Sequence, residues 1–126
     1  MAISYTFRPD GDTLYVKAQG YDESMEEVVR YGMATIQAAQ AAGCRRVLCD
    51  ELDLTYRLGT FDTFTAAETI SLHAPHVARV AIVCQPQSLA DAEFWETVAA
   101  NRGLTVRVFL DCASAEAWLA ARLEQA

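Results

Sequence analysis

The chain has 126 residues and a formal net charge of −7, and 52% of its residues are hydrophobic. This length predicts one domain, residues 1–126, that buries roughly two-thirds of its unfolded surface without needing a metal or a disulfide. An acidic surface repels phosphate backbones, and the densest basic step is only Arg45-Arg46. Nucleic-acid binding is therefore disfavoured as a function class.

No segment indicates export or membrane insertion. The N-terminus lacks a basic region followed by an apolar stretch, so no secretory signal is expected. No apolar run approaches the ~20 residues of a membrane span. The four cysteines form no Cys-x-x-Cys pair, and two of them lie in apolar runs, where a reduced cysteine behaves as a small hydrophobe. We therefore expect a cytoplasmic protein.

The first elements along the chain are two strands. Residues 3–8 and 14–19 each alternate apolar and polar side chains with the period of two that half-buried strands show. Pro9-Asp10-Gly11-Asp12 between them has turn chemistry. The two segments therefore predict a β-hairpin, which Gly20 ends.

A helix is expected next, from about residue 24 to residue 42. Ser24 and Glu27 fit a capping box, in which each side chain satisfies the other residue's backbone N–H. Gly43 lies where a C-cap glycine belongs. The apolar run 46–50 is typical of a central strand covered on both faces. A polar, hydroxyl-rich loop from 51 to 63 is expected after it.

The second half predicts three more helices and two more strands. A helix over about 62–74 stops at Pro75, and the apolar run 80–84 is a strand. Ser88 is expected to cap the next helix, residues 105–109 form the last strand, and Asp111 or Ser114 caps a final helix. The expected buried residues of these helices are, in chain order, Phe64, Ala67, Ile70, Phe94, Trp95, Val98, Ala99, Ala115, Trp118, Leu119 and Leu123.

The resulting order, β-β-α-β-α-β-α-β-α, predicts an α/β fold. Strands separated by helices of this length are joined by right-handed crossovers, which produce a largely parallel sheet. The N-terminal hairpin adds an antiparallel edge strand, so the sheet is mixed and mostly parallel.

Packing patterns over most of the chain match a known layout. They are the opening hairpin, the helix ending at Gly43, Val47-Leu48-Cys49-Asp50, Val80-Ala81-Ile82-Val83, and the tail from Phe94-Trp95-Glu96-Thr97 through Arg107-Val108-Phe109 to Ala117-Trp118-Leu119. Together they resemble the STAS domain, the SpoIIAA-like fold of bacterial anti-anti-sigma factors.

This resemblance implies a non-enzymatic regulatory or protein-interaction domain. Anti-anti-sigma factors bind an anti-sigma kinase and are switched by phosphorylation of a serine in an Asp-Ser-Ser-Gly-like step, which opens the helix after the third strand. The corresponding region here, residues 58–64, has no Ser-Ser-Gly, and Asp62-Thr63 is its nearest match. The fold group also resembles the lipid-carrying CRAL-TRIO proteins, so the alternative is a binder of a small apolar or lipid-like ligand.

The candidate interaction and switch surface joins the third strand to the following helix. Thr60 and Thr63 are candidate modified hydroxyls, although either of them, or Asp62, could instead cap the helix. Tyr56, Phe61 and Trp95 either pack in the core or form an exposed apolar patch for a protein partner, a second copy of the chain or a small ligand. The whole set is Asp50, Tyr56, Thr60, Phe61, Asp62, Thr63 and Trp95.

No pattern indicates a catalytic, cofactor or metal site. Asp50, Glu51 and Asp53 could gather around a cation, but strand alternation points the first two in opposite directions. Cys112 lies near a helix start, where the pKa of a thiol tends to fall, yet it has no candidate base. Phosphate-binding glycine loops, Gly-x-Ser-x-Gly elbows and His-Glu-x-x-His motifs are absent from the sequence. The sequence therefore does not support an enzyme, and an enzyme that uses Asp50 or Cys112 is the third and weakest alternative.

Overall fold

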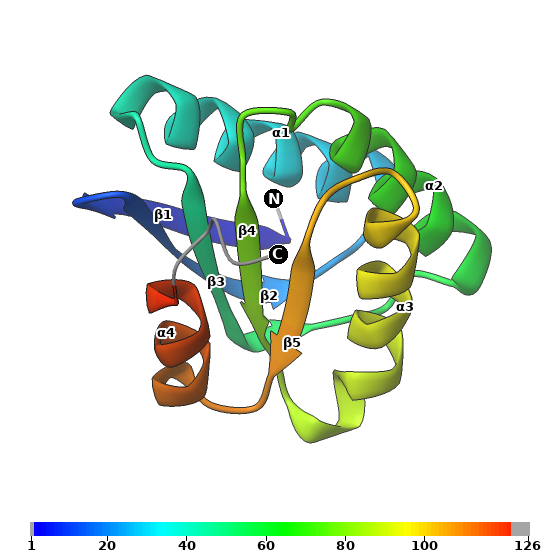
Figure 1. Cartoon of the computed structure of the whole chain (residues 1–126). Helices are drawn as coiled ribbons and strands as arrows, with labels where there is room; N and C mark the ends of the chain where they lie inside the picture. The colour runs from blue at the N-terminus through cyan, green and yellow to red at the C-terminus, as the bar shows by residue number, and fades with distance from the viewer. Residues whose placement is uncertain (1, 122–126) are drawn as a thin grey trace.

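The computed structural model describes residues 2–121 as a five-stranded sheet with helices on both faces (Figure 1). The strands are β1 (Ile3–Asp10), β2 (Thr13–Tyr21), β3 (Arg46–Thr55), β4 (Arg79–Val83) and β5 (Val106–Phe109). The helices are α1 (Met25–Ala42), α2 (Thr60–Leu72), α3 (Leu89–Ala100) and α4 (Cys112–Ala120), and a 3-10 turn, η1 (Pro86–Ser88), leads into α3. The predicted order of elements and the mixed α/β sheet are confirmed.

The strands lie in the order β1-β2-β3-β4-β5, with β1 antiparallel to β2 and all other neighbours parallel. Because each parallel strand is added on the same side of the previous one, right-handed crossovers place α1, α2 and α3 on one face of the sheet. Helix α4 packs on the opposite face, against β3, β4 and β5 (Figure 1). None of the helices in residues 2–121 has the length and apolar character needed to cross a membrane.

The sheet therefore separates two cores of different size. On the side of α1, α2 and α3, the larger core includes Val47 and Cys49 of β3. On the side of α4, the smaller core contains Leu48 of the same strand together with Ala81, Val83, Ala115 and Leu119. Alternation along β3 thus supplies side chains to both cores, as expected for a strand that is covered on both faces.

The apolar stripes predicted for α2 and α3 are confirmed at Ala67, Ile70, Val98 and Ala99, which are buried, but not at the two phenylalanines. Phe64 and Phe94 are only partly buried and belong to neither core, so their predicted core positions are wrong. Ala66 and Ala92, which were not predicted, are fully buried together with the predicted Ala99. Small side chains at a helix contact allow the two axes to approach closely, and the large rings then lie beside the contact.

Strand β3 runs to Thr55, so the loop expected over residues 51–63 begins five residues later, at Tyr56. The extra length pairs with β2, where Gln19 is opposite Asp53 and Tyr21 is opposite Thr55, beyond a register shift. Because this extension is polar, the sequence did not indicate a strand there. The backbone of the extension pairs with only one neighbouring strand, β2. Glu51 consequently lies in a strand, and its side chain is buried.

At the ends of α1, the predicted C-cap is present, and so is one of the two hydrogen bonds of the predicted capping box. Ser24 caps the helix by accepting a hydrogen bond from the backbone N–H of Glu27 at 3.2 Å. The Glu27 carboxylate does not complete the capping box, because it accepts from the backbone N–H of Ile3 at 3.1 Å. Gly43 ends the helix with φ at 71°, the left-handed conformation that glycine adopts without strain.

The later helices confirm one of the remaining predicted caps. Asp111 caps α4 by accepting from the backbone N–H of Ser114 at 2.7 Å. Ser88 precedes α3 but makes no capping hydrogen bond, because η1 already places it in a helical conformation. Leu123, which was expected in the final helix, lies outside the described residues.

Candidate functional site

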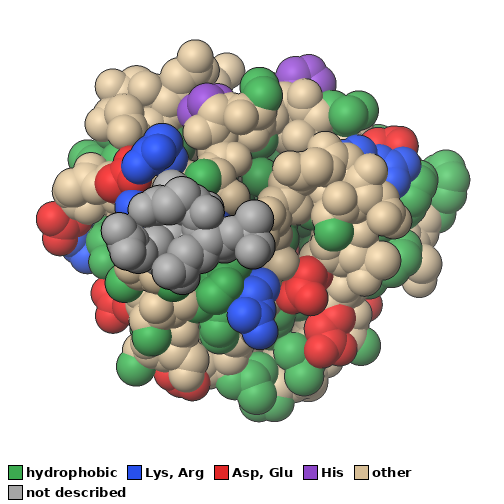
Figure 2. All heavy atoms as spheres, in the orientation of Figure 1, with side chains coloured by type: hydrophobic (Ala, Val, Ile, Leu, Met, Phe, Trp, Pro, Cys, Tyr) green, Lys and Arg blue, Asp and Glu red, His purple; other side chains and the backbone are tan. Residues whose placement is uncertain are grey.

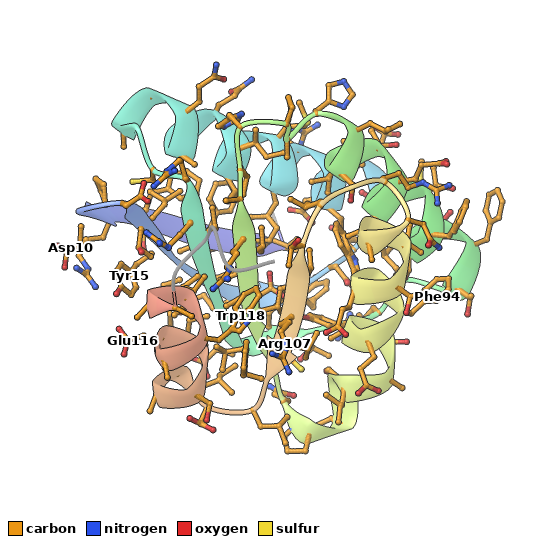
Figure 3. The ribbon with its side chains drawn as sticks, in the orientation of Figure 1. Asp10, Tyr15, Phe94, Arg107, Glu116 and Trp118 are labelled. Atoms are coloured by element: carbon orange, nitrogen blue, oxygen red, sulfur yellow. The ribbon has the colours of Figure 1, made fainter. Side chains whose placement is uncertain are left out.

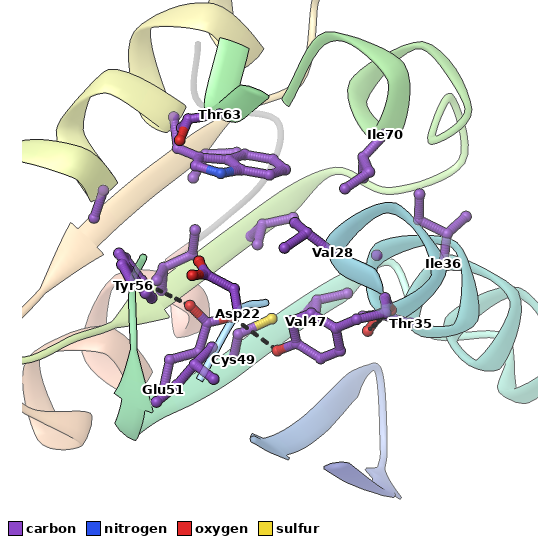
Figure 4. A pocket seen from close by; sticks show the side chains of 18 of the residues that line it. Asp22, Val28, Thr35, Ile36, Val47, Cys49, Glu51, Tyr56, Thr63 and Ile70 are labelled. Atoms are coloured by element: carbon purple, nitrogen blue, oxygen red, sulfur yellow. Dashed lines mark hydrogen bonds between the residues drawn. The ribbon is translucent and has the colours of Figure 1, made fainter. Parts of the chain in front are cut away.

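A cavity of about 110 Å³ lies between the sheet and helices α1, α2 and α3 (Figure 4). Most of its wall is apolar, with Val28 and Ile36 from α1, Ile70 from α2 and Val47 from β3. Asp91, at the start of α3, is exposed and also lines the cavity, so the cavity reaches the surface at that point. Since an apolar cavity of about 150 Å³ holds benzene, this one suits a molecule of similar size or smaller.

One end of the cavity is polar. Glu51 of β3 accepts a hydrogen bond at Oε2 from the hydroxyl of Tyr31, at 2.8 Å, and another at Oε1 from the hydroxyl of Tyr56. Figure 4 shows Glu51, Tyr56 and Asp22 together at this end, with Ile36 and Ile70 at the other. An apolar space with a few convergent polar groups is the usual form of a small-molecule site.

Burial dominates the electrostatics of this polar end. It raises the pKa of Glu51, an effect that the hydrogen bonds from Tyr56 and Tyr31 oppose and the nearby charges of Asp22 and Asp50 reinforce. Burial also raises the pKa of both tyrosines well above the ordinary value. Their hydroxyls are therefore protonated at neutral pH and remain hydrogen-bond donors.

Asp22 positions the chain segment that carries Tyr56. Its side chain is buried just beyond the end of β2, and Oδ1 accepts from the backbone N–H groups of Arg57 and Leu58, the latter at 3.1 Å. Burial raises the pKa of Asp22, and these two hydrogen bonds lower it in part. Because Asp22 ties down the two residues after Tyr56, it holds the phenol against Glu51.

The structure divides the predicted site residues into three groups. Tyr56, Thr63 and Trp95 line the cavity. Thr60, Phe61 and Asp62 are exposed in the first turn of α2, where Phe61 is 78% accessible. Asp50 belongs to a separate hollow on the face that carries α4. Tyr56 and Trp95 therefore do not form an exposed aromatic patch with Phe61.

The two candidate hydroxyls at the start of α2 differ in accessibility. Thr63 is buried, and its hydroxyl donates to the carbonyl of Gly59 at 2.9 Å. Thr60 is exposed. The expectation that Thr60, Asp62 or Thr63 caps α2 is wrong, because the helix begins at Thr60 and Gly59 is the N-cap residue. All three side chains thus lie inside the first turn.

Asp50 contributes to an ion-pair cluster instead of a cation site. The Lys17 ammonium lies 3.3 Å from Asp50 and 2.9 Å from Asp53, while Glu51 points to the opposite face as strand alternation predicted. Among residues 2–121, no group of three or more His, Cys, Asp or Glu side chains is arranged to hold a metal ion.

The hollow beside Asp50, of about 360 Å³, lies where α4 leaves β1 and β2 uncovered. Here the Tyr15 hydroxyl donates to Glu116 of α4 at 3.0 Å, and Figure 3 shows these two side chains near each other. Lys17 and Asp50 form an ion pair, and Tyr15 and Glu116 a hydrogen bond, so these four side chains of the hollow already have partners.

Cys49 in the cavity wall, Cys112 in the hollow and the nearby Cys84 are poor nucleophiles. Burial raises the pKa of Cys84 to about 11 and raises that of Cys49 further. Burial and the charge of Asp50 also raise the pKa of Cys112, so the low pKa expected at a helix start is wrong. At neutral pH all three are thiols, whereas the thiolate is the reactive form.

Several basic side chains on the surface are paired with acidic ones. On the face shown in Figure 2, Lys and Arg side chains lie apart from one another, several beside acidic ones. Arg46 lies 2.7 Å from Asp12, and Arg102 pairs with Glu68. On this face the basic side chains do not form the continuous basic surface that nucleic-acid binding requires.

Sequence reasoning missed Tyr31 and Asp22 as site residues, and it considered Glu51 only as a possible cation ligand beside Asp50 and Asp53. A signal for Glu51 was present, because alternation from Val47 through Cys49 places it on the buried face of β3. Tyr31 similarly follows Val28 at helical spacing. No local pattern indicated that these side chains meet, since Tyr31 and Glu51 are 20 residues apart.

Comparison with known proteins identifies the fold. No protein-family model and no curated protein matches the chain, but solved structures do, and one with a SpoIIAA-like fold confirms the predicted fold. One of them is an uncharacterised protein of the DUF3478 family from Shewanella loihica PV-4. It superposes with a TM-score of 0.56 at 21% sequence identity, over 94% of each chain. Similarity at this level establishes the fold alone, so a function has to be inferred from the geometry of the site.

Proposed function

We propose that this protein binds a small, mostly apolar molecule in the cavity between the sheet and α1, α2 and α3. The observation that carries the proposal is an apolar cavity that ends at the hydrogen-bonded carboxyl of Glu51. With about 110 Å³, the cavity suits a ligand of roughly benzene's size. A long-chain lipid, of the kind that CRAL-TRIO proteins carry, would require the helices to move away from the sheet.

Trp95 provides a direct reporter for this function because it lines the cavity, whereas Trp118 packs on the opposite face of the sheet. In a Trp118→Phe variant, Trp95 is the sole indole of the chain. Titration with toluene should change its fluorescence saturably and raise the melting temperature, since a ligand that binds only the folded state stabilises it.

Two alanines of α3 supply matched variants. Ala92 lines the cavity and Ala99 does not, although both are fully buried. Ala92→Leu should fill the cavity and abolish toluene binding, and it should change the unfolding free energy by less than about 1 kcal/mol. Ala99→Leu should retain toluene binding and lower the unfolding free energy by about 1–3 kcal/mol through overpacking. Absence of saturable binding to the wild-type chain, or binding that survives Ala92→Leu, contradicts the proposal.

Regulation through a protein partner is a second candidate, supported by the start of α2. Phe61 is largely exposed there, and the neighbouring Thr60 hydroxyl is accessible at the helix N-terminus, where a phosphate is electrostatically favoured. Intact mass of protein purified from its host should show one added phosphoryl group, which Thr60→Val removes. An unmodified mass under every growth condition rejects this phosphorylation switch.

A further inference from the structure

The polar end of the cavity contains a buried acid that lacks a cation. Both oxygens of Glu51 accept hydrogen bonds from tyrosine hydroxyls, as an ionised carboxylate does. Burying an ionised carboxylate is costly unless an opposite charge accompanies it. None of the ion pairs within residues 2–121 includes Glu51.

Other charges at this end make it more negative. Asp22 and Asp91 line the same cavity as Glu51. The Arg57 charge acts on Asp22, but its guanidinium lies over the ring of Tyr21, 3.9 Å from the centroid. Three acidic side chains therefore border the cavity, and the nearby cation stacks on an aromatic ring that is not part of the cavity wall.

We propose that the ligand is a small organic cation, a protonated primary amine on a compact apolar body, with its ammonium group toward Glu51 and Asp22. This inference rests on the proposed function of the cavity and specifies the ligand class. An ammonium group has three N–H donors, and each oxygen of Glu51 has a second lone pair. Both backbone hydrogen bonds to Asp22 end on Oδ1, so Oδ2 retains its capacity to accept.

The rest of the wall suits such a ligand. Val28, Ile36 and Ile70 would surround the hydrocarbon body, and the rings of Tyr31 and Trp95 in the wall are groups that attract cations. A neutral alcohol of the same shape would gain the apolar contacts and a hydrogen bond without the charge attraction. A carboxylate would be repelled by the acidic side chains.

Three compounds with one branched hydrocarbon body separate these cases: isopentylamine, isopentanol and isovalerate. Each is titrated near neutral pH into the Trp118→Phe variant, with Trp95 fluorescence and melting temperature as readouts. We expect isopentylamine to bind at least about tenfold more tightly than isopentanol, because a charge pair inside the cavity adds to the shared apolar contacts. Isovalerate should give no saturable signal.

Two isosteric variants test the residues. Glu51→Gln keeps an oxygen that accepts from one tyrosine and adds an amide that donates to the other, and Asp22→Asn keeps the oxygen that accepts from Arg57 and Leu58. Glu51→Gln should reduce the preference for the amine over the alcohol to about threefold or less, while isopentanol affinity stays within about twofold of the wild type. Asp22→Asn should reduce the preference by a smaller factor.

The outcomes distinguish this inference from the proposed function. If isopentanol or toluene binds the wild-type chain and isopentylamine binds no more tightly, the amine inference is wrong and the cavity function stands. The same holds if the amine preference survives both Glu51→Gln and Asp22→Asn. If neither toluene nor any of the three compounds binds, the proposed function itself fails. Should Glu51→Gln not fold, the wild-type ratio and Asp22→Asn decide.

Discussion

The pKa of the Glu51 carboxyl is subject to two opposing effects. Burial raises its pKa above the ordinary value, and the hydroxyls of Tyr56 and Tyr31 stabilise the ionised form without fully offsetting that effect. When the pKa of an acid is higher in the folded state than in the unfolded state, the folded state binds the proton more tightly. Stability at this residue is therefore greatest below the unfolded pKa and decreases as the pH rises through the folded pKa.

Glu51→Gln should expose this pH dependence. Because glutamine carries no charge at any pH, the unfolding free energy of the variant relative to the wild type should be higher at about pH 8 than at about pH 5. Urea denaturation at both pH values measures the difference. Tyr56→Phe removes one hydrogen-bond donor to Glu51 and should make the unfolding free energy depend more steeply on pH. If the unfolding free energies of wild type and Glu51→Gln change with pH in parallel, the prediction is wrong.

Among the elements, β2 has as its next-to-last residue a glycine, Gly20, that no other residue can replace without strain. Gly20 has φ at 102°, and a Cβ built there collides with the backbone carbonyl oxygen of Ala2, which lies beside it in the hairpin. Gly59, by contrast, has φ at −71° and open space around the Cβ position. The two glycines therefore have different structural requirements.

Gly20→Ala should destabilise the protein by more than about 2 kcal/mol, because the left-handed conformation and the backbone collision both oppose it. Gly59→Ala is the matched control and should cost less than about 1 kcal/mol as a change at a helix N-cap. Chemical denaturation followed by circular dichroism compares them. Equal costs at the two positions would show that the hairpin tolerates a side chain at residue 20.

The order of the elements could be predicted because periodicity is a local property. The alternation over residues 3–8 and 14–19 and the apolar runs 46–50 and 80–84 all became strands. The boundaries were less predictable. Strand β3 extends to Thr55 through pairing with β2, and α2 begins at Thr60 beside a cap without a side chain. Both boundaries depend on backbone partners that no local pattern specifies.

For the whole molecule, the sheet separates a large core from a small one. The small core joins α4 to the sheet through a few side chains, including Leu119, which is 3% exposed. Elements with few buried apolar contacts open locally at lower free energy than the rest of a protein. Helix α4 is therefore the element most able to detach while the sheet and the cavity side remain folded.

Hydrogen exchange should show this order of opening. Amides of α4 are expected to exchange faster than those of β3 and β4. Leu119→Ala should lower the unfolding free energy by about 2–5 kcal/mol and increase the exchange rates of α4 amides more than those of the sheet. Leu110→Ala is the control, because its side chain is 46% exposed and its removal should cost less than about 0.5 kcal/mol. If α4 exchanged only with the whole molecule, the two cores would form one cooperative unit.

The sequence by itself determined the order of strands and helices and the mixed, mostly parallel sheet, because side-chain periodicity and right-handed crossovers leave few alternatives. Only the tertiary structure decided that Tyr31, Glu51 and Tyr56 meet around a cavity, and that Phe61 is exposed while Trp95 faces inward. A cavity is the space left when helices and sheet do not fill the volume between them. That volume depends on the distances between elements remote in the chain, which no local pattern records.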